Sequence, residues 1–168
     1  MATRWAASFF PQNYNMFTRK HKYFNTFGGS PVAAAAGLAV LDVIREENLI
    51  ENAKKTGAFL IENLKNLSNK HLAIGDVRGA GLLVAMELVS NRKSKKPDTA
   101  QTVSVINQLK ENGILIGAAG AWGNILKIRP PLCFTKDNVE FFVSTCDQIF
   151  STSEIVKSKV DRYARTKK

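Results

Sequence analysis

Residues 73–89, AIGDVRGAGLLVAMELV, mark the point at which the chain changes from a helical to a strand pattern. Upstream, apolar residues recur every three or four positions, whereas here they form two short runs separated by glycines. Such runs, bounded by a glycine-bearing turn, are typical of paired strands. We therefore expect strands at roughly 73–77 and 82–89, placed directly after a helical region.

Two amphipathic helices are predicted upstream of this pair, over residues 31–70. Ser30 is a suitable N-cap and Pro31 suits the first helical position, where its missing N–H costs nothing. The run that follows is alanine-rich and places an apolar stripe at Val32, Ala36, Ala39, Val43 and Ile44. The second helix has apolar or small residues at a spacing of three and four: Leu49, Ala53, Thr56, Leu60, Leu64 and Leu67.

Downstream, a loop at 90–98 leads into a predicted helix over 99–113, with Val103, Ile106, Leu109 and also Val105 as candidates for its inward face. The segments ILIGA and ILKIRP predict two more strands, the second ended by two prolines that cannot donate to a ladder. Thr135 then caps a last helix that we expect to run through about Phe150. The order of elements predicts an α+β fold with helices on one face of a mostly antiparallel sheet.

The composition excludes several classes of protein. The chain has 168 residues, is 45% hydrophobic and 23% charged, and has no apolar run near the roughly 20 residues that span a bilayer. We expect no membrane association. Cys133, Cys146, His21 and His71 do not have the spacing of a zinc site, so we expect no metal and a reduced, intracellular pair of thiols.

The net charge of +10 lies mostly at the two ends. Residues 1–22 carry four basic residues and no acid, and residues 151–168 carry six basic residues and two acids. A nucleic-acid module concentrates its positive charge on the folded surface, so we expect no nucleic-acid partner. The basic, acid-free start resembles part of a mitochondrial transit sequence, which favours a mitochondrial location over the cytoplasm; the alternative is a disordered or foreign leader.

Three places could carry chemistry. Thr26 lies beside Gly28 and Gly29 at a helix entry, where a hydroxyl and backbone amides can hold an anion such as a phosphate; an ordinary turn is the alternative. Arg129 ends an apolar strand, where a rigidly held guanidinium can grip a carboxylate; an arginine reaching into solvent is the alternative. The loop GDVRGAG opens a strand and not a helix, so Arg78 is interpreted as a structural turn residue.

Three motifs together resemble a known family: FNTFGGSPVAAAAGLAVLDVIREENL, IGDVRGAGLLVAMELV and GNILKIRPPLCFTKDNVEFF. In this order and spacing they resemble the C-terminal part of class III aminotransferases, which are pyridoxal 5′-phosphate enzymes of fold type I. The similarity is greatest to the alanine–glyoxylate aminotransferase 2-like branch, which also contains phospho-lyases. It covers roughly residues 23–150.

The resemblance implies roles for the two candidate residues. The threonine matching Thr26 helps to hold the phosphate of pyridoxal phosphate, across the dimer interface in the neighbouring subunit's site. The arginine matching Arg129 typically holds the substrate carboxylate. It also implies four parts: a leader at 1–22 outside the resemblance, a phosphate turn with interdomain helices at 23–72, the small C-terminal domain at 73–150, and a basic tail at 151–168.

The chain departs from the family pattern because no Schiff-base lysine domain precedes the Thr26 motif. We therefore expect the C-terminal portion of an aminotransferase that is inactive alone, with no catalytic residue of its own. In the complete enzyme an amino donor and a keto acid would be the small-molecule substrates, and the chain would form a homodimer or pair with a full-length relative. The alternatives are a fragment of a phospho-lyase and a non-catalytic interaction protein; a nucleic-acid binder that uses the tails ranks last.

Overall fold

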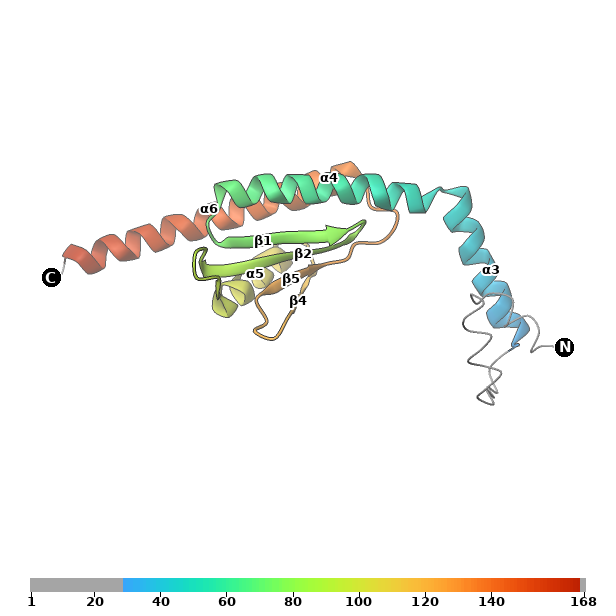
Figure 1. The fold of residues 1–168 in the computed structure, drawn as a ribbon, viewed down its shortest axis with the longest axis horizontal. Helices are drawn as coiled ribbons and strands as arrows, with labels where there is room; N and C mark the ends of the chain where they lie inside the picture. The colour runs from blue at the N-terminus through green and yellow to red at the C-terminus, as the bar shows by residue number, and fades with distance from the viewer. Residues whose placement is uncertain (1–28, 167–168) are drawn as a thin grey trace. The chain divides into compact units, whose positions relative to one another are not determined.

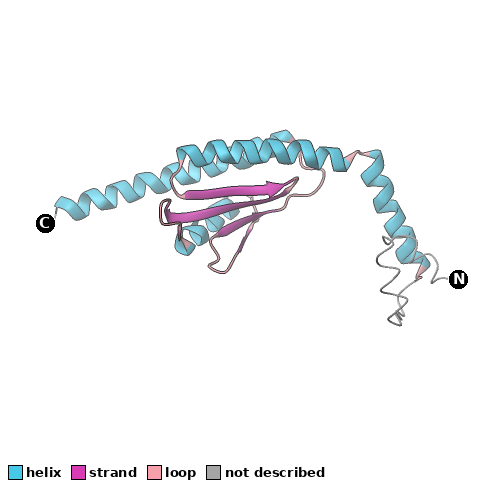
Figure 2. Ribbon diagram, viewed as in Figure 1, coloured by secondary structure: helices cyan, strands magenta, loops and turns pink. Residues whose placement is uncertain are grey.

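The structure, a computed structural model, describes the backbone of residues 29–166 and the side chains of residues 29–152. The chain divides between Asn48 and Leu49 into two units, which are described separately below. Figures 1 and 2 show the elements of each unit. No helix in the described part of the chain has the long uncharged apolar stretch that would be needed to cross a bilayer.

The first unit contributes helix α3, Pro31–Glu46. Its start is as predicted: the Ser30 hydroxyl accepts a hydrogen bond from the Ala33 amide at 3.4 Å, and Pro31 occupies the first turn. Near its end, Arg45 pairs with Asp42 at 2.6 Å. The apolar stripe predicted for this helix is not covered, since no residue of α3 is buried.

The second unit begins with helix α4, Leu49–Lys70, the second of the two predicted helices. The stripe predicted from the spacing is its buried face, because Leu60, Leu64 and Leu67 are 0–2% exposed. Thr56 and Gly57 are buried on the same face. Burial of three leucine side chains, at about 1.5–3 kcal/mol each, is a large part of what holds α4 on the sheet.

The sheet has five strands, and every pairing is antiparallel. Their order is β1-β2-β5-β4, with the short β3 also paired to β2. The strands are β1 Ile74–Ala80, β2 Leu83–Asn91, β3 Lys96–Pro97, β4 Gly117–Ala119 and β5 Ile125–Ile128. The α+β class and the antiparallel sheet predicted from the sequence are therefore confirmed.

The core lies between this sheet and three helices: α4, α5 (Thr99–Glu111) and α6 (Lys136–Thr166). Figure 1 shows α4 and α6 side by side over the sheet. Alternate residues of β2 and β5 point into the core, which gathers Val84, Met86, Leu88, Leu126 and Ile128. The opposite face carries the charged or half-buried side chains of Arg78, Glu87 and Lys127.

A register irregularity in β1 explains an apparent break of the alternation. Ile74 and Val77 are both buried although they are three residues apart, which a regular strand would place on opposite faces. The register shifts between Ile74 and Asp76, so the two side chains reach the same side. Asp76 and Arg78 are exposed.

Several predicted details are wrong. Val103 is 51% exposed and not inward, because α5 buries Thr102, Val105 and Leu109, a stripe turned by one residue. Thr102 tolerates burial because its hydroxyl donates to the Asp98 carbonyl at 2.7 Å. The last helix continues to Thr166, past the end expected near Phe150. The strand expected at ILIGA is shorter and is shifted to Gly117–Ala119.

Candidate functional site

Arg129 lies immediately after β5, at the end of the strand as predicted. The preceding residue, Ile128, is 6% exposed and pairs with Val84 of β2, so the backbone leading to Arg129 is fixed in the sheet. The Arg129 side chain is exposed, and no ion pair or hydrogen bond joins it to any residue that the structure describes. Its guanidinium can therefore take an external anion.

The segment that follows, residues 129–135, is anchored at both ends. At its start the chain leaves the β2–β5 pairing, and Pro130 and Pro131 restrict the backbone. At its end Thr135 caps α6: its hydroxyl accepts from the Asn138 amide at 3.3 Å, and the Asn138 side chain accepts from the Thr135 amide at 3.1 Å. The predicted cap is thus confirmed, in a reciprocal form.

The middle of this segment is held by a residue that the sequence did not single out. Asn52 of α4 donates through Nδ2 to the carbonyls of Leu132 at 2.7 Å and Phe134 at 3.1 Å. The Asn52 Oδ1 accepts from the Thr56 hydroxyl at 3.2 Å. In the sequence, Asn52 could have been noticed only because it lies four residues before Thr56 on the buried side of a predicted helix. That spacing does not indicate which distant residues Asn52 contacts.

Thr26 lies outside the described residues, so its role stays a prediction. The nearest described positions are Gly29, with φ +93°, and the Ser30 cap of α3. A positive φ favours glycine, which accounts for one member of the glycine pair at this entry to the helix.

The segment GDVRGAG forms most of strand β1, so the interpretation of Arg78 as a turn residue is wrong, although its side chain is paired within the chain. Arg78 donates to Asp76 at 2.5 Å and to Glu87 at 2.8 Å, both on the exposed face of the sheet. These two carboxylates raise the pKa of Arg78, and the hydrogen bond that Arg78 donates to Asp76 contributes most. Because Asp76 and Glu87 both accept hydrogen bonds from it, the Arg78 guanidinium is not available to bind a ligand.

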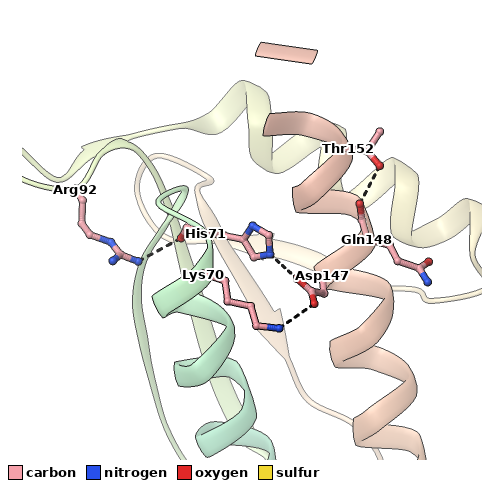
Figure 3. Close-up of polar contacts among 6 residues, drawn as sticks. All are labelled: Lys70, His71, Arg92, Asp147, Gln148 and Thr152. Carbon is pink, nitrogen blue, oxygen red and sulfur yellow. Dashed lines mark hydrogen bonds and ion pairs between the residues drawn. The ribbon is translucent and has the colours of Figure 1, made fainter. Parts of the chain in front are cut away.

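A second polar cluster closes the end of α4 (Figure 3). The Arg92 guanidinium donates to the carbonyls of Ser68, His71 and Ile74. Ser68 lies in the last turn of α4, His71 directly follows the helix, and Ile74 begins β1. His71 is 4% exposed and its Nε2 lies 2.6 Å from Asp147 Oδ1, while Lys70 contacts Asp147 Oδ2 at 3.2 Å. These contacts join the C-terminal end of α4, the β2–β3 connection and α6.

The cluster shifts the pKa of Asp147. The hydrogen bond from His71, with a further one from Lys70, lowers the pKa of this carboxyl below its usual value. In the adjacent core, burial raises the pKa of the Cys146 thiol to about 12, so this cysteine stays protonated and inert. Cys146 is buried and stays protonated, and Asp147 stays ionised in its pair with His71, so neither has the properties expected of a catalytic acid, base or nucleophile.

Two shallow cavities of about 270 Å³ and 250 Å³ lie in the second unit, one between α4 and α6 and one beside β1 and β2. Arg129 lines neither of them. No group of histidine, cysteine or acidic residues able to hold a metal ion occurs in the described part of the chain.

The fold is shared with pyridoxal-phosphate enzymes. A phospholyase from Arthrobacter in complex with phosphoethanolamine matches with a TM-score of 0.76 and 33% identity, over 82% of this chain and 33% of that protein. An amine transaminase from an uncultivated Pseudomonas species, in its pyridoxal-phosphate-bound form, matches with a TM-score of 0.70 and 35% identity, over 81% of this chain and 31% of that one. The class is therefore that of fold type I transaminases and their relatives.

The sequence assigns the family. Residues 5–150 match the model of aminotransferase class III, and the chain belongs to this family. It is 52% identical over 141 residues to the mitochondrial alanine–glyoxylate aminotransferase 2 homolog 2 of Arabidopsis thaliana, which covers 84% of this chain and 29% of that protein. Pyridoxal phosphate, the cofactor implied by the resemblance, is confirmed as that of the family.

The chain spans about a third or less of the length of the relatives it matches. The family match begins at residue 5, within the segment 1–22 that we set outside the resemblance, so the similarity reaches further toward the N-terminus than the three motifs indicate.

Proposed function

We propose that this chain is the C-terminal portion of a pyridoxal-phosphate-dependent class III aminotransferase, which moves an amino group from an amine or amino acid to a keto acid. The observation that carries the proposal is Arg129: a guanidinium on a rigid strand end, exposed and not paired with any described acid. Such a group can bind a carboxylate through two parallel hydrogen bonds. The role of Arg129 in binding the substrate carboxylate is supported by the membership of this chain in the class III aminotransferase family.

The roles of the two candidate residues differ. Arg129 would orient the substrate by its carboxylate, and Thr26 would hold the phosphate of pyridoxal phosphate across the interface of a dimer. When bound, pyridoxal phosphate supplies the electron sink for the reaction. In this proposal the substrate is bound by Arg129 of this chain together with side chains from other polypeptide in the assembled enzyme.

The carboxylate role is tested on the full chain by nuclear magnetic resonance. A keto acid such as pyruvate is titrated while the guanidinium Nε–H signal of Arg129 is followed. We expect a saturable shift in the unsubstituted chain and little change in Lys127→Gln, which removes an exposed positive charge two residues away. Arg129→Gln lacks the Nε–H group, so its binding is followed at the backbone amides of Ile128 and Leu132, where we expect the saturable shift of the unsubstituted chain to be lost. An aldehyde without a carboxylate should give no shift. Equal keto-acid binding by Arg129→Gln would contradict the proposal.

Activity should require further polypeptide. With pyridoxal phosphate, an amino donor and a keto acid added, we expect the 168-residue chain alone to show neither the visible absorbance of bound cofactor nor turnover. The reason is that Arg129 lines neither of the two cavities described above. Transamination by the chain alone would refute this expectation.

A phospho-lyase is the second candidate, because the Arthrobacter phospholyase shares the fold with a TM-score of 0.76. Assayed in the assembled enzyme, a phosphorylated amine would release inorganic phosphate if this candidate is right, and a keto acid would be aminated if the first is.

A non-catalytic partner of an intact relative is tested by co-purification with that relative. A mitochondrial location, supported by the name of the Arabidopsis relative, is tested by import of a fluorescent fusion.

A further inference from the structure

We infer that Asn52 is a positioning residue for Arg129: its side-chain amide holds the 129–135 segment on α4 and so sets the direction in which the guanidinium is presented. The inference deepens the proposed function and rests on it for its meaning toward substrate. Asn52 touches neither substrate nor cofactor in this proposal, since it acts through the backbone of the segment.

The geometry gives Asn52 a task that its neighbours do not share. The strand pairing fixes the segment at Ile128, and the helix cap fixes it at Thr135. Between them, the described hydrogen bonds are a turn from the Phe134 amide to the Pro131 carbonyl at 3.0 Å and the two bonds from Asn52. The turn lies within the segment, so it shapes the segment without attaching it to the rest of the unit. The Phe134 side chain packs against the core, and Asn52 supplies the hydrogen-bonded attachment, across 80 residues of sequence.

The chemistry of the amide makes the contact specific. Both Nδ2 protons are used, one on each of two carbonyls, and Oδ1 accepts from Thr56, which is 3% exposed. A flipped amide would set its oxygen against the carbonyls of Leu132 and Phe134, so the orientation is determined by its partners. An aspartate has the same shape but no donor, and it would repel both carbonyls.

The attachment of residues 129–135 by Asn52 affects Arg129, which is the first residue of this segment. Its side chain has no hydrogen bond to a described residue that would orient it, so its direction follows from its backbone. Pro130, which directly follows, couples the backbone of Arg129 to the rest of the segment. Loss of the Asn52 bonds would let the segment move and with it the guanidinium.

The test compares Asn52→Asp and Asn52→Leu with Asn63→Asp and Asn63→Leu in the full chain. Asn63 is a matched control, a half-buried asparagine on the same helix that donates only to the Phe59 carbonyl one turn away. We expect hydrogen exchange at the Phe134 amide to become at least about tenfold faster in both Asn52 variants than in the Asn63 variants. The leucine variant separates the lost bonds from the added charge of aspartate.

A second measurement, the keto-acid titration read at the Arg129 Nε–H signal, reports what a purely structural role would not change. Weaker keto-acid binding in Asn52→Leu, with the Asn63 controls unaffected, supports the inference. Exchange at Phe134 that is equal in the Asn52 and Asn63 variants, or that rises only together with the core amides of α4, overturns it. If exchange responds but the unsubstituted chain binds no keto acid, Asn52 is upheld as the attachment of this segment and the proposed role of Arg129 falls.

Discussion

At the scale of single residues, Gly57 sets how closely the β1–β2 turn packs against α4. A Cβ atom at this position would lie 2.1 Å from the Gly81 carbonyl oxygen and 2.7 Å from its Cα. Gly81 has φ +53°, a conformation that glycine adopts without strain. Two glycines 24 positions apart in the sequence therefore meet backbone to backbone.

Replacement of Gly57 by alanine should destabilise the chain by about 1–3 kcal/mol, because the turn must move away from the helix. The loss should be visible as a lower midpoint in urea unfolding. Gly37→Ala is the matched control in α3, since no described atom lies within 4 Å of a Cβ there and alanine is the better helix former. Equal effects of the two substitutions would show that the close contact does not exist in solution.

The pair of Asp147 and His71 predicts a pH dependence of stability. The pKa of Asp147 is lowered in the folded state, so its ionised form stabilises the fold. This contribution is fully present above the ordinary pKa of 3.8 and is lost as the pH falls through the lower folded value. Asp147→Asn should therefore reduce the free energy of unfolding at pH 7, and its difference from the unsubstituted chain should shrink below about pH 4. A difference that is constant from pH 7 to pH 3 would contradict this assignment.

At the scale of elements, Arg92 of the β2–β3 connection closes the C-terminal end of α4. The last carbonyls of a helix have no partner within it, and an arginine with several donors can serve them at once. Here the guanidinium reaches Ser68 and His71 together with Ile74 at the start of β1. One side chain thus ties a helix end to the strand that follows it.

Arg92→Met keeps much of the side-chain volume but leaves these carbonyls without their donor. We expect a loss of about 2–4 kcal/mol in the free energy of unfolding, measured by urea denaturation. Arg92→Lys should recover only part of it, because an ammonium group lacks the planar fork. The exposed neighbour Lys93, replaced by Met, should change stability by less than about 0.5 kcal/mol. An Arg92→Met variant as stable as Lys93→Met would rule out the cap.

At the scale of the whole molecule, the core belongs to the second unit. Every residue of the hydrophobic cluster lies between Leu60 and Phe150, and no residue of α3 is buried. Residues 49–168, produced alone, should therefore unfold in one cooperative transition with the urea midpoint of the full chain. Loss of the cooperative transition on removal of residues 1–48 would show that the first unit contributes to the core.

Local signals in the sequence determined most of the elements and their kind. The cap at Ser30, the stripe of α4, the turn between β1 and β2 and the cap at Thr135 each depend on residues a few positions apart. Such interactions act within the chain before it folds, so spacing alone predicts them. The three motifs likewise indicated the family, and the match over residues 5–150 confirms it.

Tertiary structure decided the contacts that join distant segments. Spacing favoured Val103 for the inward face of α5, but packing on α6 and the sheet turned the helix by one residue toward Thr102. Asn52 contacts Leu132 across 80 residues, and Arg92 donates to the Ser68 carbonyl of α4, although the sequence pattern around neither residue indicates its partner. Arg129 was predictable as the end of a strand, whereas only the folded chain shows that no acid among the described residues pairs with it. The physical reason is that periodicity and capping are set by near neighbours, while the choice of a polar side chain's partner is set only when the core brings the segments together.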